Sequence, residues 1–392
     1  MKILYHHRTA SKDGQAVHIE EMIQSLRDQG HEVVVVAPGQ GDPASGHAGS
    51  MGGEVGWVQR LRAALPKAVY ELMELAYSWV AYRRLLAAAR EFKPDVIYER
   101  YNLFLLAGLM LKRKLGLPLL LEVNAPLAQE RQLHGGGLGL PRLARWAEAR
   151  VWRGADRVLP VTDVLAGHVR AVGVPDERLV VIPNGINEDH FAGAPTPAEA
   201  KRRLGWDGAL VLGFTGFVRD WHGMDLVIRW LASPQVPQAA RLLLVGDGPA
   251  RADLEKLARE LGLQDRVRFT GVVDRHAVPG HVAAFDIALQ PAVVAYASPL
   301  KLFEYLALGK AVVAPNTPNL AEVLVDGQNA LLFDAKAPQA LEAALAQLVA
   351  DAPLRERLGA AAKATIKERR LTWHHNAERV VGLARQLAGR GA

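Results

Sequence analysis

Short runs rich in β-branched and leucine residues alternate with amphipathic stretches along the whole chain, and they fall into two series. The first series is Lys2–Tyr5, Glu32–Ala37, Asp95–Tyr98, Leu119–Val123, Arg157–Val161 and Leu179–Ile182. The second is Leu210–Thr215, Leu242–Val245, Val267–Phe269, Ile287–Gln290, Ala311–Ala314 and Ala330–Phe333. Strands that alternate with helices build parallel sheets. We therefore expect an α/β protein with two doubly wound parallel sheets.

A chain of 392 residues is longer than one hydrophobic core usually organises, which agrees with two domains. The segment IPNGINEDHFAGAPTPAEA separates the two series and is rich in Pro, Gly and Ala, so we place the boundary near Asn184. A last helix that opens at Trp373 is free to return to the first domain. We expect an N-terminal domain of residues 1–183 plus 374–392 and a C-terminal domain of residues 184–373.

The composition excludes several classes of protein. Half of the residues are apolar and 22% are charged, as in a globular chain, and the absence of cysteine excludes disulfides and thiolate metal sites. The N-terminus MKILYHHRTA lacks the apolar core of a signal peptide, so we expect a cytoplasmic protein. The net charge of +6 favours an anionic partner. A diphosphate and acidic lipid are candidates, whereas nucleic acid has only this charge in its favour.

The segment SPLKLFEYLALGK predicts a short helix that binds an anion. Ser298 suits the N-cap, Pro299 the first helical position, and Leu300 the buried face. A helix N-terminus binds phosphate, and Lys301 in the first turn opposes the dipole unless an anion lies there. Glu304 shares a face with Lys301, where its carboxylate could accept two ribose hydroxyls. The alternative is an ordinary capped helix with a surface Lys–Glu pair.

Two glycine-containing loops follow strands of the second series. GFTGFVRDWHG displays Arg219 and His222 after Gly216, and LLLVGDGP places Gly246 directly after a strand. Ligands bind in such sheets at the carboxyl ends of the strands. Arg219 could clamp a diphosphate, and Gly246 could let the backbone approach a ligand. A solvated arginine and a plain tight turn are the alternatives.

Polar residues also follow the strands of the first series. Gly14 precedes the first helix, His18 lies one turn inside it, and LEVNAP places Glu122 and Asn124 at another strand end. YERY places Glu99 and Arg100 in the same way. We expect these residues to line one edge of the first sheet, although a single histidine such as His18 is more often structural.

Three motifs are excluded or absent. HGGG at 134–137 resembles an esterase loop, but the chain has no G-x-S-x-G to supply the nucleophile. Gly39, Gly41 and Ala44 nearly match a dinucleotide fingerprint, yet a Gly-rich stretch and not a helix follows them. No two aspartates are spaced as D-x-D, so we expect no required divalent metal.

A long amphipathic stretch begins at Arg60. Its apolar residues at helical spacing are Val69, Leu72, Leu75, Trp79, Tyr82 and Leu86, and its basic residues are Arg60, Arg62, Lys67, Arg83, Arg84 and Arg90. Such a helix could rest on anionic lipid at the inner face of a membrane. Packing against the N-terminal domain explains the apolar positions equally well.

In their order, these segments resemble a retaining nucleotide-sugar glycosyltransferase of the GT-B fold, family 4. The resemblance is carried by GHEVVVVAP, VIPNGINEDHF, FTG-x5-HG, LLLVGDGP, VRFTGVV, SPLKLFEYLALGKAVVAP and the Trp373 helix. It implies two Rossmann-like domains that face each other across a cleft. It also implies that the C-terminal domain holds the sugar nucleotide and that the last helix packs back on the N-terminal domain.

The resemblance assigns roles to single residues. Glu304 matches the second Glu of the family's E-x7-E motif, which binds ribose, and Gly14 matches the glycine at the donor phosphate. Phe217 stands where the family usually has arginine and His222 where it usually has lysine, so Arg219 and Lys301 are expected to replace that basic pair.

Two positions depart further from the family. Tyr296 stands where the first Glu of E-x7-E is usual, and Asn124 is a counterpart of the family's N-terminal histidine. The expected function is therefore transfer of a sugar to a glycan, lipid-linked or other hydroxyl acceptor in polysaccharide or glycoconjugate synthesis, with the donor as substrate and no cofactor. The alternatives are an epimerase or phosphorylase of the same fold and a non-catalytic sugar-nucleotide binder.

Overall fold

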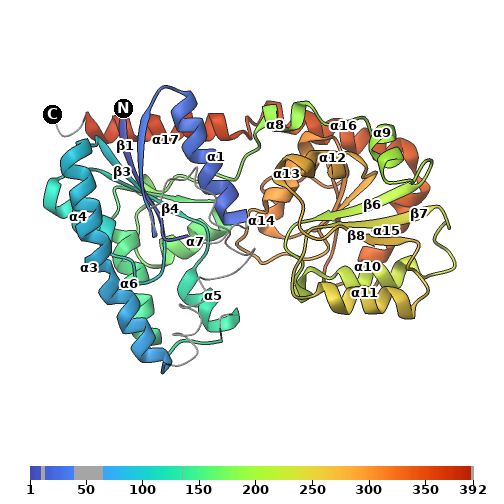
Figure 1. The fold of residues 1–392 in the computed structure, drawn as a ribbon, viewed down its shortest axis with the longest axis horizontal. Helices are drawn as coiled ribbons and strands as arrows, with labels where there is room; N and C mark the ends of the chain where they lie inside the picture. Colours follow the sequence, from blue (N-terminus) through green and yellow to red (C-terminus); the bar gives the residue numbers. More distant parts are fainter. Residues whose placement is uncertain (10–13, 39–64, 135, 390–392) are drawn as a thin grey trace. The chain divides into compact units, whose positions relative to one another are not determined.

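The computed structural model describes residues 1–9, 14–38, 65–134 and 136–389 (Figure 1). The near-fingerprint at Gly39, Gly41 and Ala44, the start of the basic stretch at Arg60 and Arg62, and part of the HGGG motif lie outside these residues. The chain divides into two compact units. Unit 1 comprises Met1–Pro183, Tyr296–Ser298 and Trp373–Ala392, and unit 2 comprises Asn184–Ala295 and Pro299–Thr372.

Unit 1 contains a five-stranded parallel sheet in the order β2-β1-β3-β4-β5. Its strands are β1 (Lys2–His6), β2 (Glu32–Val36), β3 (Val96–Arg100), β4 (Leu119–Val123) and β5 (Arg157–Pro160). The expected strand at Leu179–Ile182 is wrong. Val180 and Ile182 donate backbone hydrogen bonds to β5, but the pairing amounts to one isolated bridge between Val158 and Leu179, which is too short to form a strand.

Helices cover this sheet (Figure 1). They are α1 (Gly14–Asp28), α3 (Lys67–Phe92), α4 (Ala107–Leu115), α5 (Leu127–His134), α6 (Pro141–Gly154), α7 (Asp163–Ala171) and α17 (Trp373–Ala388), with a 3-10 turn η1 (Asp176–Arg178). The buried face of α1 contains Ile19, Met22 and Leu26, as its spacing predicts, and α17 packs beside α1. Trp373 was expected in the second domain but belongs to unit 1, because its ring packs against His18 with the centroids 4.7 Å apart.

Unit 2 contains a six-stranded parallel sheet in the order β11-β10-β9-β6-β7-β8. Its strands are β6 (Leu210–Thr215), β7 (Ala240–Val245), β8 (Val267–Phe269), β9 (Ile287–Leu289), β10 (Ala311–Pro315) and β11 (Leu331–Phe333). Successive side chains of β7 enter two different cores, Leu242 and Leu244 on one face and Leu243 and Val245 on the other. Apolar residues therefore continue along the strand without alternation.

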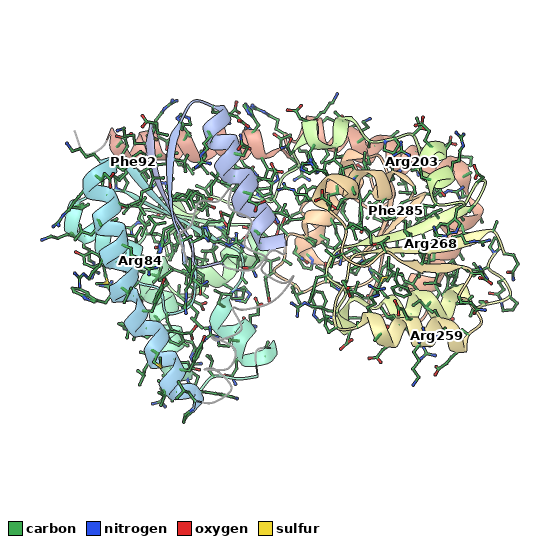
Figure 2. All side chains as sticks on the ribbon, in the orientation of Figure 1. Arg84, Phe92, Arg203, Arg259, Arg268 and Phe285 are labelled. Atoms are coloured by element: carbon green, nitrogen blue, oxygen red, sulfur yellow. The ribbon has the colours of Figure 1, made fainter. Side chains whose placement is uncertain are left out.

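Helices cover both faces of the second sheet (Figure 1). They are α8 (Glu188–Ala192), α9 (Pro197–Arg203), α10 (Met224–Leu231), α11 (Arg251–Glu260), α12 (Val278–Ala283), α13 (Leu300–Ala307), α14 (Pro318–Ala321), α15 (Ala340–Ala350) and α16 (Ala352–Glu368), with the 3-10 turns η2 (Asp220–His222) and η3 (Arg275–Ala277). Phe285, labelled in Figure 2, is fully buried between the sheet and these helices. Among the helices of the described residues, none is long and apolar enough to cross a bilayer.

The strand order reverses at one place in each sheet. In unit 2 the order runs one way from β6 to β8 and the other way from β9 to β11, and β6 pairs with β9. In unit 1 the corresponding neighbours are β1 and β3. Ligands of open α/β sheets bind beyond the carboxyl ends of the strands at such a switch point. The residues after β6 in unit 2 and after β1, β3 and β4 in unit 1 are therefore the places where a site is expected.

A short excursion of the chain was not expected from the sequence. Tyr296–Ser298 belongs to unit 1, although the residues before and after it belong to unit 2. The Thr162 hydroxyl donates a hydrogen bond to the Tyr296 carbonyl at 2.9 Å, and the Tyr296 hydroxyl donates to Glu130 at 2.9 Å. The predicted continuous domain of residues 184–373 is corrected accordingly.

Candidate functional site

In unit 2, the carboxyl end of β6 is joined to α13 by side-chain hydrogen bonds. The Thr215 backbone N–H donates to the Tyr305 hydroxyl at 2.9 Å, and the Thr215 hydroxyl donates to a carboxylate oxygen of Glu304 at 3.3 Å. Tyr305 is fully buried, so this contact fixes the helix against the strand. Sequence reasoning missed Thr215 and Tyr305, although both lie inside the motifs FTG and LFEYL that it used.

Lys301 lies over the aromatic ring that precedes this junction. Its Nζ is 3.6 Å from the centroid of the Phe214 ring, and a Cβ added to Gly216 would lie 3.3 Å from the same nitrogen. Gly216 has a φ of +114°, which only glycine adopts readily. The ammonium therefore lies beside the backbone at the end of β6. Burial lowers the pKa of Lys301 to about 7, against the opposing effect of Glu304. Lys301 and Glu304 are therefore not the ordinary surface Lys–Glu pair that the sequence left as the alternative.

The start of α13 differs from the expectation. The helix begins at Leu300, and Pro299 occupies the N-cap with φ −69° and ψ 123°. This ψ is extended, so Pro299 is not the first helical residue, and no side chain caps the helix. Ser298 belongs to unit 1 and is not the N-cap. The first helical N–H groups are those of Leu300 and Lys301, at the positive end of the helix dipole.

Glu304 is half-buried on the next turn of α13. Burial raises the pKa of its carboxyl group, while the charges of Lys301 and Arg275 and the Thr215 hydrogen bond act in the opposite direction. Arg275 comes from η3, which is far from α13 in the sequence, and no motif pointed to it. A carboxylate with one oxygen held by Thr215 still has lone pairs for two vicinal hydroxyl groups.

The loop after Gly216 presents Arg219 at the surface. Its guanidinium carbon lies 4.9 Å from the centroid of the Phe217 ring. Phe217, which stands where the family usually has arginine, therefore supports Arg219 by a cation–π contact. Arg219 is exposed, as expected of a residue that meets a ligand. The aromatic contact restricts the directions in which its side chain can extend.

His222 is buried under the same loop, although the sequence predicted that the loop displays it. Its Nδ1 accepts the backbone N–H of Arg219 at 3.0 Å, and its ring lies between Phe214 and Trp221. Burial, together with the charges of Lys301 and Arg219, lowers the pKa of His222 to about 2. A neutral imidazole cannot replace a lysine, so His222 holds the loop that carries Arg219.

Gly246 also has a structural reason to be glycine. Its φ is +130°, and a Cβ at this position would collide with the backbone carbonyl of Gly216. The neighbouring Gly248 lies in the same way against the backbone of Val218. The loops after β6 and β7 thus stack on each other. The close approach at Gly246 is to another loop and was not foreseen from the sequence.

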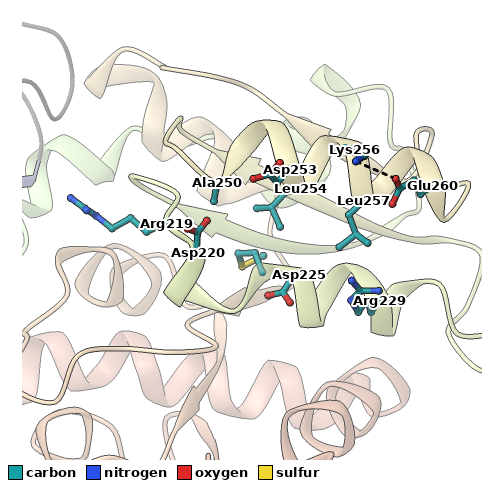
Figure 3. Close-up of a pocket in the computed structure, with 11 residues that line it drawn as sticks. Arg219, Asp220, Asp225, Arg229, Ala250, Asp253, Leu254, Lys256, Leu257 and Glu260 are labelled. Atoms are coloured by element: carbon teal, nitrogen blue, oxygen red, sulfur yellow. Dashed lines mark ion pairs between the residues drawn. The ribbon is translucent and has the colours of Figure 1, made fainter. Parts of the chain in front are cut away.

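A groove of about 390 Å³ lies between α10 and α11 (Figure 3). Asp225 and Arg229 of α10 and Leu254 and Leu257 of α11 line it. Arg219 borders the groove as well, and the end of its side chain extends away from the other lining residues (Figure 3). Among the described residues that line the groove, none belongs to α13. It is separate from the cluster of Lys301, Gly216 and Glu304.

The carboxyl ends of β3 and β4 in unit 1 contain two buried carboxylates, Glu99 and Glu122. Glu99 accepts a hydrogen bond from the Gly108 backbone N–H at 3.0 Å, and it pairs with His6 at 2.5 Å. Because Gly108 lies in the first turn of α4, Glu99 stabilises the start of that helix. Glu99 was expected to line the edge of the sheet, and the structure shows it to be almost fully buried.

Glu122 is the centre of the second cluster. Its carboxylate contacts His18 at 2.9 Å, Tyr98 at 2.7 Å, Arg100 at 2.5 Å and the side-chain amide of Asn124 at 2.5 Å. Burial alone would raise the pKa of Glu122, but the charges of His18 and Arg100 and the hydrogen bonds from His18 and Tyr98 lower it well below its usual range. Glu122 therefore keeps its charge and fixes the Asn124 amide, which is half-buried.

Gly14 is the first residue of α1 and is exposed. The structure thus places Gly14 at a helix N-terminus on the same unit as Asn124, and it places Arg219, Lys301 and Glu304 together on the other unit. The cluster in unit 2 combines two cations, the start of a helix and a carboxyl group. Such a set suits a diphosphate next to a pair of hydroxyl groups.

The chain is similar to known glycosyltransferases. Residues 12–190 match the model of Glycosyltransferase Family 4, and residues 198–365 match the model of Glycosyl transferases group 1. A D-inositol 3-phosphate glycosyltransferase of Stackebrandtia nassauensis is 31% identical over 74% of this chain and 67% of its own length. An α-D-kanosaminyltransferase of Streptomyces kanamyceticus is 26% identical over 64% of this chain and 66% of its own length.

Among solved structures, HepE of Anabaena in complex with UDP superimposes with a TM-score of 0.76. The match covers 98% of this chain and 100% of HepE at 18% identity. This likeness and the two doubly wound parallel sheets confirm the expected GT-B fold class.

Proposed function

We propose that this chain, which belongs to glycosyltransferase family 4, transfers a sugar from a nucleotide-diphosphate donor with retention of the anomeric configuration and without a required metal ion. The observation that carries the proposal is the Lys301 ammonium, held against Phe214 beside the backbone of Gly216. Lys301 is half-buried, and its ammonium lies in the first turn of α13, where a positive charge opposes the helix dipole. The diphosphate of a donor would add its negative charge to that of Glu304 at this place.

The donor diphosphate is assigned to Lys301, Arg219 and the first N–H groups of α13. Lys301 gives a charge at a fixed place, and Arg219 gives a guanidinium that can bind two phosphate oxygens at once. His222 contributes indirectly, because it binds the backbone of Arg219. We assign the ribose hydroxyls of the donor to Glu304, whose carboxylate already receives a hydrogen bond from Thr215.

The chemistry requires the diphosphate to leave while positive charge develops on the anomeric carbon. The bond from this carbon to the phosphate oxygen breaks, the acceptor oxygen bonds to the same face of the carbon, and the departing phosphate takes the acceptor's proton. Cations and dipoles that are already in place stabilise the growing charge of the leaving group. In this proposal Lys301 and Arg219 have that role, and no nucleophile of the protein is needed.

The acceptor is assigned to the edge of unit 1. Asn124 is held there by Glu122, whose lowered pKa favours the charged form. The curated relatives are named for acceptors or sugars with many hydroxyl groups. We infer a hydroxyl acceptor on a glycan or lipid-linked glycan, in polysaccharide or glycoconjugate synthesis in the cytoplasm.

The proposal is tested first by binding. UDP-, GDP- and dTDP-sugars are added to the full chain, and stabilisation against thermal unfolding identifies the donor. The product of a transfer reaction with that donor is then examined by NMR, and retention requires the anomeric configuration of the donor. Conversion of the donor in the absence of an acceptor would indicate an epimerase. Activity that depends on free phosphate would indicate a phosphorylase, and donor binding without turnover would indicate a non-catalytic binder.

The residues are tested by kinetics. Arg219→Ala and Lys301→Met should each lower kcat roughly 100- to 1000-fold, and the double variant should be less than additive because both act on one leaving group. Arg229→Ala is the matched control, since it removes an exposed arginine that lines the groove between α10 and α11. A normal kcat in Arg219→Ala together with a severe loss in His222→Ala would show that the basic pair has been misplaced.

A further inference from the structure

The longest helix of unit 1, α3, has its charged and apolar residues on unexpected sides in its first half. Glu71 and Glu74 are buried. Glu71 accepts the backbone N–H groups of Gly139 and Leu140 at 2.8 and 2.7 Å, and Glu74 forms ion pairs with Arg131 and Arg8. The carboxylates on this stretch of the helix therefore face the protein.

The opposite face of the same stretch is apolar and exposed. Its residues are Val69, Leu72, Met73, Ala76, Trp79 and Val80. Leu72 is 52% exposed and Trp79 is 57% exposed. By contrast Leu75, Tyr82 and Leu86, which the sequence grouped with them, pack against the core of unit 1. We call the six exposed residues the apolar face of α3.

The exposed side of α3 becomes cationic one turn later. Arg83, Arg84 and Arg90 are exposed there beside the exposed carboxylate of Glu91, so the net charge is positive, and Figure 2 labels Arg84 on this helix. Trp79 lies at the junction of the two halves, with its ring centroid 5.4 Å from that of Tyr82. Along this side of the helix, apolar side chains are followed by aromatic rings and then by arginines. The same order of preferred side chains is found in a bilayer from the acyl region to the headgroups.

A second copy of the chain does not complement this surface well. In an antiparallel pair, the three arginines of one copy would lie beside the apolar face of the other, which has no acidic residue. Glu71 and Glu74 cannot help, because they are buried and already paired. An anionic lipid surface satisfies both halves at once, since acyl chains meet the apolar face and phosphates meet the arginines.

We propose that the exposed side of α3 docks on a membrane that contains anionic lipid. The apolar face enters the boundary between headgroups and acyl chains, and Arg83, Arg84 and Arg90 bind lipid phosphates. Unit 1, to which the acceptor is assigned, is the unit that would be held at the membrane. The surface is a property of α3 and does not depend on the donor chemistry of unit 2.

The test is sedimentation of the full chain with vesicles, without donor or acceptor. Phosphatidylcholine vesicles with and without anionic phosphatidylglycerol are compared. Wild type should bind the anionic vesicles. Arg83→Ser/Arg84→Ser should weaken binding roughly 10- to 30-fold, and Leu72→Ser/Trp79→Ser should abolish it.

Matched controls come from unit 2. Arg202→Ser/Arg203→Ser removes an adjacent exposed pair of arginines from α9, and Leu226→Ser removes an exposed leucine from α10. Both should bind vesicles as wild type does. No binding of wild type, or equal binding of the α3 variants and the controls, would overturn the proposal. Self-association in sedimentation velocity that Leu72→Ser/Trp79→Ser abolishes would assign the face to a second copy instead. Because only vesicle binding is measured, failure here leaves the glycosyltransferase assignment unaffected.

Discussion

Donor binding should be accompanied by the uptake of a proton at Lys301. Burial lowers the pKa of this ammonium to about 7 in the free protein. A diphosphate beside Nζ favours the charged form and raises that pKa again. The protonated protein therefore binds the donor better, and affinity must decrease as the pH rises above the pKa of the free site.

The size of the effect follows from the same value. At pH 8 a group with a pKa near 7 is protonated in about one molecule in eleven, so binding should take up about 0.9 proton per donor. At pH 6 the uptake should decrease to about 0.1 proton. Between pH 7 and pH 9 the affinity should weaken roughly 50-fold, provided that Lys301 stays protonated in the complex.

Titration calorimetry measures this uptake directly. The donor is titrated at one pH in buffers of different ionisation enthalpy, and the slope of observed enthalpy against ionisation enthalpy gives the number of protons. An intact nucleotide sugar is used, since its diphosphate diester does not titrate in the neutral range. Lys301→Arg keeps the charge but cannot lose its proton, so both the uptake and the pH dependence should vanish.

Two further variants separate Lys301 from its neighbours. Glu304→Gln removes the carboxyl group of α13 and should leave the uptake in place. His222→Asn should also leave it unchanged, because His222 with a pKa of about 2 stays neutral throughout. Proton uptake that is undiminished in Lys301→Arg would refute the reasoning. Proton uptake that is lost only in Glu304→Gln would show that the carboxyl group of Glu304, and not Lys301, binds the proton.

Three other outcomes are expected. Glu304→Gln should weaken donor binding by about 1.5–3 kcal/mol in calorimetry with unchanged thermal unfolding, and unaltered affinity would remove Glu304 from the ribose site. Activity should survive EDTA, and a loss that magnesium or manganese restores would show that a metal is required. Gly246→Ala should lower the free energy of unfolding by about 1–3 kcal/mol, because Gly246 has a φ of +130° and the added Cβ would collide with the Gly216 carbonyl. A variant as stable as the wild type would show that the loops after β6 and β7 do not stack as described.

Local pattern was sufficient to predict the strands. Leu119–Val123 and Leu210–Thr215 were predicted with the bounds that β4 and β6 have, because apolar runs bounded by turn residues depend on neighbours in the sequence. The error at Leu179–Ile182 arose from the same method, since an apolar run does not show whether a partner strand continues beside it. The helix that carries Lys301 and Glu304 was also predicted, but its start was placed one residue early at Pro299.

The sequence by itself determined two doubly wound sheets and the residue types that we propose to bind a diphosphate, because periodicity, turn residues and motif order are local properties of the chain. Only the tertiary structure decided the state of those residues. Burial lowers the pKa of Lys301, whose Nζ lies over the Phe214 ring, and burial together with the charges of Lys301 and Arg219 favours the neutral imidazole of His222. Likewise, the apolar face of α3 points outward, because Glu71 on the other face accepts backbone hydrogen bonds from Gly139 and Leu140 inside the unit. The burial and the electrostatic environment of a residue depend on segments that are distant from it in the sequence, so a local sequence pattern cannot predict them.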